Sequence, residues 1–254
     1  MLELRAVTKK YHAFPAVDNV GFVVKPGESV GYLGPNGAGK STTLKMLAGF
    51  LKPTEGEILY KGRNIWKNLV WFKERMGYVP EDQAVYLHLS ARDYLMMIAR
   101  LRGIREKAAQ AKIERFMRVF GLSGDMNAEM STYSKGMVQK VLLSSALLHD
   151  PEVLLLDEPL TGLDVTTAMT IREVVREMAA AGKIIIYSSH ILEIVEKVSS
   201  RVIILHKGRV AADDSVENLS RLMSLPSLGE IFSRLVSQED PRAAALELID
   251  AAKR

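Results

Sequence analysis

The alternation of hydrophobic and polar positions predicts a sheet at the beginning of the chain. Residues 2–7 alternate between apolar and polar side chains, as a half-buried strand does. Residues 20–24 form a second apolar segment that ends at Pro26-Gly27-Glu28, and residues 29–33 form a third that leads into a glycine-rich turn. Apolar positions at helical spacing follow over residues 42–50. The chain therefore begins with short strands and one strand, loop and helix unit.

The pattern becomes helical in the middle of the chain and then returns to strands. Residues 90–149 are expected to be mostly α-helical, and Ser90-Ala91-Arg92-Asp93 has the pattern of a capping box at their start. Residues 153–156 and 183–187 are continuous apolar runs, which are typical of parallel strands buried on both faces. A helical segment, residues 166–180, lies between them. An α/β layer therefore resumes after the helical segment.

Composition narrows the class of protein. Of 254 residues, 48% are hydrophobic and 25% charged, as in a folded globular protein. The formal net charge of +4 is too small to indicate a nucleic-acid-coating surface, although a pI near 9.1 would favour anionic neighbours. Charge alone therefore leaves the partner open, and the expectation of no nucleic-acid partner depends on the motifs described below. The absence of cysteine excludes disulfides and thiolate metal sites. Because no signal-peptide pattern is present and no apolar run approaches the roughly 20 residues that span a bilayer, we expect a chain that does not cross a membrane.

A phosphate-binding loop follows the third strand. Residues 34–41, Gly-Pro-Asn-Gly-Ala-Gly-Lys-Ser, have the spacing of a P-loop between a strand and a helix. Glycines let backbone N–H groups converge on phosphate oxygens at the positive end of the next helix. Lys40 can bridge the β- and γ-phosphates, and Ser41 can ligate Mg²⁺. The residues expected to bind the nucleotide phosphates are Gly34, Asn36, Gly37, Ala38, Gly39, Lys40, Ser41 and Thr42.

Two carboxylates end the buried run at 153–156. Asp157 is placed to hold Mg²⁺ through water, and Glu158 to polarise the attacking water, which fits phosphoryl transfer to water. The alternative for this pair is a solvated strand end. Together with Lys40, Glu158 is therefore a candidate catalytic residue.

Further motifs make the family specific. Residues 133–137, Tyr-Ser-Lys-Gly-Met, followed by Gln139-Lys140, resemble the signature loop of ABC transporters. In family order, Tyr11 resembles the aromatic platform for adenine and Glu81 stands at the Q-loop position. Residues 161–164 resemble the D-loop, and Ser189-His190 resembles the segment with the switch histidine. The resemblance covers about residues 1–208.

The resemblance implies an ATP-hydrolysing, nucleotide-binding subunit that uses ATP and Mg²⁺. Separate membrane-spanning subunits would place it at the cytoplasmic face of the membrane, and a second nucleotide-binding chain would form a homodimer or a related heterodimer. Ser134 and Gly136 would contact the γ-phosphate bound by that second chain. His190 would contact the γ-phosphate or orient Glu158, and Mg²⁺ would be held at Ser41, Glu81 and Asp157.

The fold that the motifs imply is α/β, a P-loop NTPase core with a mostly parallel central sheet, an N-terminal antiparallel β subdomain and an α-helical subdomain. We expect the core with its β subdomain at 1–89 and 150–212 and the helical subdomain with the signature loop at 90–149. A C-terminal helical extension is expected at 213–254, because Asp240-Pro241 offers a cap and a first-turn proline for a helix over 242–252.

Several positions leave alternatives open. Glu81 replaces the family's usual glutamine, so metal binding should survive better than an amide-dependent step. Lys135 replaces a glycine and either approaches the second chain's γ-phosphate or points into solvent. Asp164 either links the two ATP sites of a dimer or caps a helix. Glu81, Met137 and residues 227–232 resemble the exporter branch that handles drugs, lipids, polysaccharides or antibiotics.

The apolar face that begins at residues 227–232 either packs on its own domain or docks a partner. The competing function is a soluble ABC-family ATPase in translation or DNA maintenance, whose usual second nucleotide domain or coiled-coil insertion is not seen in this sequence. A regulatory module without turnover would require a missing base, whereas Glu158 and His190 are both present.

Overall fold

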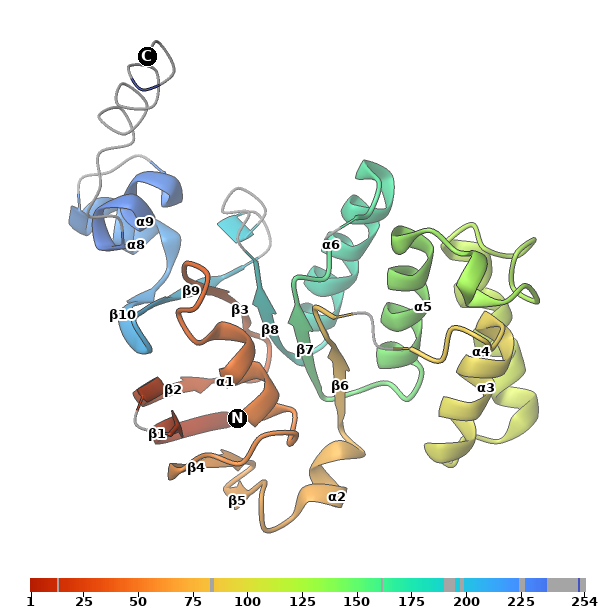
Figure 1. Ribbon diagram of the computed structural model, residues 1–254, viewed down its shortest axis with the longest axis horizontal. Coiled ribbons are helices and arrows are strands. Elements are labelled where there is room, and N and C mark those ends of the chain that lie inside the picture. Colours follow the sequence, from red (N-terminus) through yellow and green to blue (C-terminus); the bar gives the residue numbers. More distant parts are fainter. Residues whose placement is uncertain are drawn as a thin grey trace.

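The computed structural model describes residues 1–12, 14–82, 85–160, 162–189, 195–196, 199–223, 227–236 and 251. The predicted helix over 242–252 lies outside the described residues except for position 251. Two sheets with helices beside them make up the described part of the chain (Figure 1).

The first sheet is antiparallel and is built mostly from the beginning of the chain. Its strand order is β2-β1-β4-β5. Every neighbouring pair in this sheet runs antiparallel. The strands are β1 (Leu2–Tyr11), β2 (Phe14–Val24), β4 (Glu55–Tyr60) and β5 (Arg63–Asn64). The alternation at residues 2–7 therefore belongs to a strand, as predicted, and that strand continues to Tyr11.

The second sheet has the order β10-β9-β3-β8-β7-β6. Its pairs are parallel apart from β10, which runs antiparallel to β9. Each residue of β3, β7 and β8 is buried, which explains their unbroken apolar sequences. The strands are β3 (Ser29–Leu33), β6 (Met76–Val79), β7 (Val153–Asp157), β8 (Ile184–Ser188), β9 (Arg201–His206) and β10 (Arg209–Asp214). The mostly parallel central sheet is thus confirmed.

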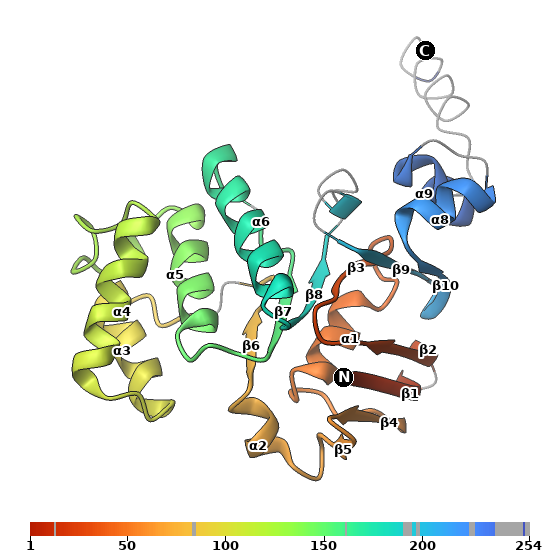
Figure 2. The same cartoon turned by 180° about the vertical axis from the view of Figure 1, so that it is seen from behind.

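Helices surround this sheet. Helices α3, α4 and α5 lie together at one end of the molecule, and α8 and α9 lie at the other (Figures 1 and 2). The helix predicted over 42–50 instead covers Lys40–Leu47, because Gly49 takes a left-handed φ of 71° that ends it. The helices are α1 (Lys40–Leu47), α2 (Leu69–Lys73), α3 (Ala91–Leu101), α4 (Glu106–Val119), η1 (Met130–Thr132), α5 (Lys135–Leu147), α6 (Val165–Ala180), α8 (Val216–Met223) and α9 (Leu228–Val236).

The central sheet separates two apolar cores, and β7 shows how one strand serves both. Leu154 and Leu156 face the core shared with the helical layer. Val153 and Leu155 face the core shared with α1 and the antiparallel sheet. Leu228 and Ile231 of α9 are fully buried in the first of these cores. The apolar face of α9 therefore packs on its own chain, which decides between the two alternatives for this segment.

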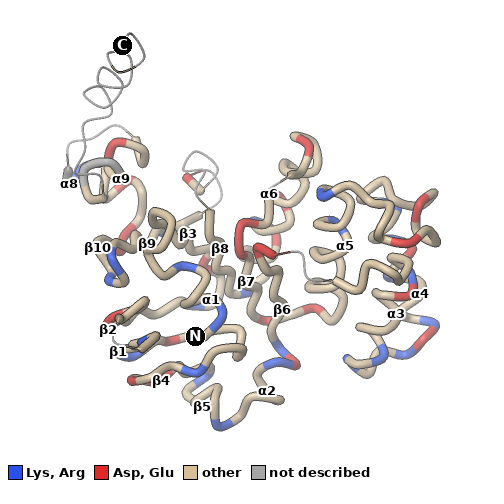
Figure 3. Tube along the Cα trace, viewed as in Figure 1, with Lys and Arg blue, Asp and Glu red and all other residues tan. Residues whose placement is uncertain are grey.

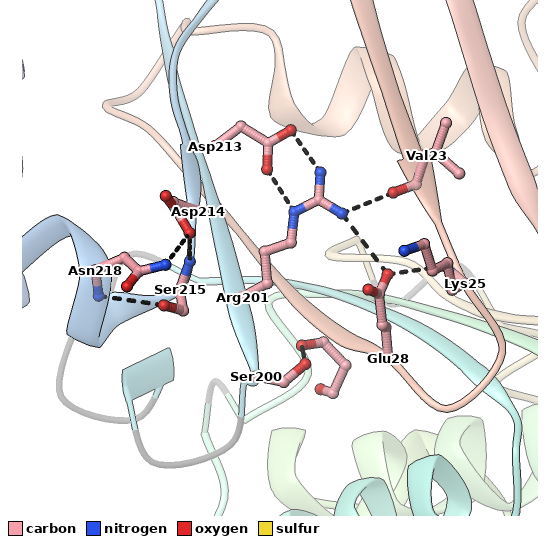
Figure 4. Close-up of polar contacts among 10 residues, drawn as sticks. Val23, Lys25, Glu28, Ser200, Arg201, Asp213, Asp214, Ser215 and Asn218 are labelled. Carbon is pink, nitrogen blue, oxygen red and sulfur yellow. Dashed lines mark hydrogen bonds and ion pairs between the residues drawn. The ribbon is translucent and has the colours of Figure 1, made fainter.

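A partly exposed charge network joins β9 to its neighbours. Arg201 makes a bidentate ion pair with Asp213 of β10, at 2.5 and 2.6 Å, and donates to the carbonyl of Val23 at 2.8 Å (Figure 4). Its guanidinium also lies 3.6 Å from Glu28. The network ties the edge of the central sheet to the end of β2.

The division of the chain at residues 89, 149 and 212 stays a prediction.

Candidate functional site

The phosphate loop is fixed by close backbone approach. It connects β3, which ends at Leu33, to α1, which begins at Lys40. A Cβ at Gly39 would lie 2.5 Å from the carbonyl oxygen of Ala16, and one at Gly34 would lie 2.7 Å from that of Leu205. Gly39 also has a φ of 105°, which disfavours any other residue. Glycine is therefore required at these two positions by packing against β2 and β9.

Lys40 is held over the loop that precedes it. Its side chain is buried, and its Nζ donates to the carbonyl of Gly34 at 2.7 Å and to that of Pro35 at 3.2 Å. These two carbonyl dipoles and the nearby charge of Asp157 offset part of the cost of burying the ammonium. Phosphate oxygens at the same loop would supply the opposite charge.

Two parallel strands bring acidic residues to Ser41. Val79 of β6 pairs with Leu156 of β7, so Glu81 and Asp157 follow neighbouring strand ends. The Ser41 hydroxyl lies 3.4 Å from Glu81 Oε2 and 3.4 Å from Asp157 Oδ1. Acidic positions are seen in red beside the end of β7 in Figure 3. The structure thus brings together the three residues expected at the metal.

Asp157 is the most buried carboxylate of this group. Burial raises its pKa and the charge of Glu81 adds to this rise, whereas hydrogen bonds from Ser188 and Ser41 and the charge of Lys40 oppose it. Ser188 Oγ donates to Asp157 Oδ1 at 2.6 Å, while Oδ2 is buried without a hydrogen-bond partner among the described residues. A buried carboxylate oxygen without a partner is costly unless a ligand reaches it.

The donor set fits Mg²⁺, which prefers carboxylate, hydroxyl and phosphate oxygens and keeps several waters. In the described part of the chain, no three His, Cys, Asp or Glu side chains come together as metal ligands. The protein alone would thus supply few ligands, and the unpartnered Asp157 Oδ2 supports a cation at this place.

Glu158 follows β7 in an unusual conformation. Its φ is 49°, a left-handed value that is unfavourable by roughly 1–2 kcal/mol for a residue with a Cβ. Its N–H lies 3.2 Å from both the carbonyl and the hydroxyl oxygen of Ser188. The bond to β8 stabilises a turn that aims the Glu158 side chain at the phosphate loop.

Part of the phosphate loop lines a cavity of about 310 Å³ together with Glu81 and Glu158. Ala38 of the loop is buried, and so is Asp157, whose Oδ1 lies 3.4 Å from the Ser41 hydroxyl. Tyr11 is half exposed at the end of β1. His190 lies outside the described residues, as does Thr161. The cavity is lined by Ala16, Asn36, Gly37, Gly39, Lys40, Ser41, Thr42, Glu81 and Glu158.

The signature residues do not line this cavity. Ser134 caps α5 by accepting from the Met137 N–H at 3.3 Å, and Gly136 lies in the first turn of that helix. A Cβ at Gly136 would lie 2.6 Å from the carbonyl oxygen of Gly162. Within the described structure, the signature loop therefore contacts the D-loop of its own chain. It does not line the cavity at the phosphate loop of its own chain.

The structure bears on the alternatives for Asp164 and Lys135. Asp164 caps α6, accepting from the Thr167 N–H at 2.8 Å, and these hydrogen bonds hold its pKa well below the ordinary value. The capping interpretation is therefore confirmed by the structure. Lys135 is exposed, and its methylene groups lie 3.4 Å from where a Cβ of Gly162 would be.

Sequence reasoning missed two residues of the site. Ser188 contacts both Asp157 and Glu158, and Ala16 lines the cavity. The sequence did contain an indication for Ser188, because a serine at the end of one buried strand can face the carboxylate at the end of the neighbouring strand. The structure pairs Ser188 with Asp157 in this way. No local signal marks Ala16, which reaches the loop through the antiparallel sheet.

Comparisons with known proteins identify the family of this chain. The family model described as "ABC transporter" matches residues 17–161. The ABC transporter ATP-binding protein NatA of Bacillus subtilis is 37% identical over 91% of this chain and 95% of its own length. The Nod factor export ATP-binding protein I of Burkholderia pseudomallei is 35% identical over 84% of this chain and 70% of its own length.

A solved structure shares the fold. It is the dimeric ATP-binding cassette MJ0796 in a post-hydrolysis state, bound to ADP and Pi. It superposes with a TM-score of 0.78 at 24% identity and covers 85% of this chain and 98% of that chain. The chain described here belongs to the ABC transporter family, as an ATP-binding subunit that hydrolyses ATP to drive transport.

No described helix is both long and apolar enough to cross a bilayer.

Proposed function

We propose that the chain powers export through separate membrane-spanning subunits, working as one of two nucleotide-binding chains that close on ATP and Mg²⁺ at the cytoplasmic face. The observation that carries the ATPase part is the shared cavity, in which Lys40 and the loop N–H groups face Glu81 and Glu158. Export is supported by the name of the Nod factor relative and by the exporter-like Glu81 and Met137.

In this proposal each residue has a separate task. Lys40 exchanges the carbonyls of Gly34 and Pro35 for phosphate oxygens. Ser41, Asp157 and Glu81 hold Mg²⁺ directly or through water, and the ion supplies charge neutralisation to the phosphates. The backbone N–H groups of residues 36–42 orient the phosphates, and Tyr11 offers a ring to the adenine.

Glu158 acts as the base that orients and deprotonates the attacking water, assisted by His190. Single-turnover hydrolysis measured with the variant Glu158→Gln should be slower by about 10²–10⁴-fold, while ATP still binds. Glutamine keeps the size of the side chain and the backbone bonds to Ser188, so folding should be preserved. Undiminished hydrolysis would remove Glu158 from this role.

A second chain completes each site. Ser134 and Gly136 stand at the N-terminus of α5, a helix of 13 residues whose positive end favours an anion, yet they are absent from their own cavity. Mixing Glu158→Gln chains with Ser134→Arg chains should therefore restore activity that neither variant has alone, since the mixed dimer keeps one intact pair. Mixtures as inactive as their components would argue against a homodimer.

The membrane-spanning partner is expected at a cavity of about 920 Å³ between α2, β6 and the helical layer. Phe50, Val70 and Leu101 line it with 65%, 75% and 77% of their side chains exposed. A smaller cavity shares Phe50 and reaches Glu81, so a docked segment would sense the metal site. The variant Leu101→Glu should lose co-purification with the membrane subunit and retain ATP binding; retention of the subunit would exclude this surface.

The direction of transport has its own test. Cells that carry Glu158→Gln in place of the wild-type chain should accumulate more of the transported compound than wild-type cells, because export stops. A lower content of that compound in the variant cells would indicate import.

A further inference from the structure

The hairpin that carries Tyr11 has a second exposed ring. Strand β1 ends at Tyr11 and β2 begins at Phe14, and these two residues are directly opposite each other. Side chains of directly opposed residues in an antiparallel pair lie on the same face of the sheet. Phe14 is 81% exposed, more than any other large hydrophobic residue described. An apolar ring so exposed beside a candidate base platform requires an explanation.

The register shows which face the two rings share. Lys10 pairs with Pro15, but Lys9 pairs with Val17, so Ala16 is an extra residue in β2. Because of this bulge, Phe14 and Val17 lie on the same face although they are three residues apart. Val17 points at the phosphate loop, since its Cγ2 would lie 3.1 Å from a Cβ of Gly39.

The bulge also brings the hairpin against the nucleotide cavity. The carbonyl oxygen of Ala16 would lie 2.5 Å from a Cβ of Gly39, and Ala16 lines the cavity together with Asn36 and Gly37. A nucleotide whose phosphates occupy the loop therefore has its base end directed toward the residues that precede Ala16. Phe14 is two positions before it.

Tyr11 itself has one side in use. The Nζ of Lys9 lies 5.8 Å from the centre of the Tyr11 ring and is held there by its bond to the carbonyl of Lys52, at 2.9 Å. A base can therefore stack only on the other side of the Tyr11 ring. Phe14 is in none of the ring pairs seen in the described structure, so its ring is available to the same base.

We propose that Phe14 is a second positioning residue for the nucleotide, and that its ring contacts the base that stacks on Tyr11. The proposal rests on the role of Tyr11 given under the proposed function. Two rings from one hairpin enlarge the apolar area that a base covers, and each aromatic contact adds to affinity without reading the identity of the base.

The test measures dissociation constants of the purified full chain for ATP and for inorganic tripolyphosphate, which has no base. The variant Phe14→Ala should raise the constant for ATP about three- to tenfold and leave that for tripolyphosphate unchanged. Phe14→Trp should restore the wild-type value. Because Phe14 is exposed, folding should not depend on it. Tyr86→Ala, which removes another exposed ring outside the cavity, should change neither constant.

The variant Tyr11→Ala separates this proposal from the one on which it rests. If Tyr11→Ala weakens ATP binding and Phe14→Ala does not, the role of Phe14 is wrong while that of Tyr11 stands. If neither change affects ATP, stacking on the hairpin is wrong as a whole. Equal losses for ATP and tripolyphosphate with Phe14→Ala would show that the hairpin shapes the loop, and would also overturn a contact with the base.

Discussion

The glycine of the signature loop has a structural reason inside its own chain, and this can be tested with Gly136→Ala. Gly136 occupies the second position of α5. The Cβ of an alanine there would lie 2.6 Å from the carbonyl oxygen of Gly162, which is part of the backbone and cannot rotate away. The first turn of α5 or the D-loop must therefore move.

The size of the effect follows from that distance. Ordinary van der Waals contact begins at 3.4 Å, so the two segments must separate by 3.4 − 2.6 = 0.8 Å. Overpacking of this kind destabilises by about 1–3 kcal/mol. Alanine in place of glycine stabilises a helix by up to about 1 kcal/mol. The net effect of Gly136→Ala should be a loss of roughly 0–3 kcal/mol in the free energy of unfolding.

Gly229 provides a matched control. It also occupies the second position of its helix, α9, but the nearest atom to its Cβ would be Ser227 Oγ at 3.7 Å. Gly229→Ala should therefore raise the free energy of unfolding by about 0.5–1 kcal/mol. The two variants should differ by about 1–3 kcal/mol, or about 2–12 °C in thermal midpoint, measured on ligand-free protein by circular dichroism.

Equal shifts for Gly136→Ala and Gly229→Ala would refute the reasoning, because the contact with Gly162 is the only difference invoked between the two sites. Gly136 would then be needed only for contact with nucleotide on the second chain, and its replacement should lower ATP turnover with no loss of stability.

Three further predictions follow from burial and capping. Burial raises the pKa of the Asp157 carboxyl, so the folded protein loses stability as the pH rises through that pKa. Asp157→Asn should therefore raise the thermal midpoint of the ligand-free protein at pH 7. In the presence of ATP, the variant should lose the added stabilisation by Mg²⁺; both effects are measured by thermal shift. His149 has a pKa lowered to about 4 from 6.5 by burial and by nearby Arg102, so the folded protein should lose stability as the pH falls through that window. His149→Gln, which can still donate to the carbonyl of Met76, should lessen this loss in urea unfolding at pH 5 relative to pH 7. Ser90→Ala removes a hydroxyl that accepts from the N–H of the third helical residue of α3 at 3.1 Å, and should lower the free energy of unfolding by about 1 kcal/mol.

Each of these has a contrary outcome. A lower ligand-free midpoint for Asp157→Asn would show that its bond from Ser188 outweighs the desolvation of the charge. Identical pH dependence of wild type and His149→Gln would mean that folding does not shift the pKa of His149. No change for Ser90→Ala would mean that solvent replaces the cap.

The parts of the site that are continuous in sequence could be predicted. The phosphate loop can be predicted from its own glycines, Lys40 and Ser41 between a strand and a helix. Asp157 and Glu158 can be predicted because they follow an apolar run long enough to be a buried strand. The fold class followed from the same evidence, because unbroken apolar strands imply layers on both faces of a sheet.

The parts that depend on contact between distant segments could not be predicted. Nothing near Gly136 in the sequence indicates that it meets Gly162, and the left-handed φ of Glu158 depends on Ser188 in another strand. The sequence cannot predict what buries Leu228 and Ile231 for the same reason, because an amphipathic face indicates burial without indicating what covers it.

These distant contacts have a mechanical consequence for the helical layer. Several contacts among the described residues join the first two turns of α5 to the segment after Glu158. They include Gly136 against Gly162, the bond from Gln139 Nε2 to the carbonyl of Pro159 at 3.1 Å, and the ion pair of Lys140 with Asp164 at 3.2 Å.

Gln139 is buried, so its hydrogen bond lies away from competing water and cannot be exchanged freely. A rotation of the helical layer that moves the signature loop must therefore either break this bond or carry the segment after Glu158 with it. The position of the base candidate and the position of the signature loop are thus coupled within one chain, before any second chain is added.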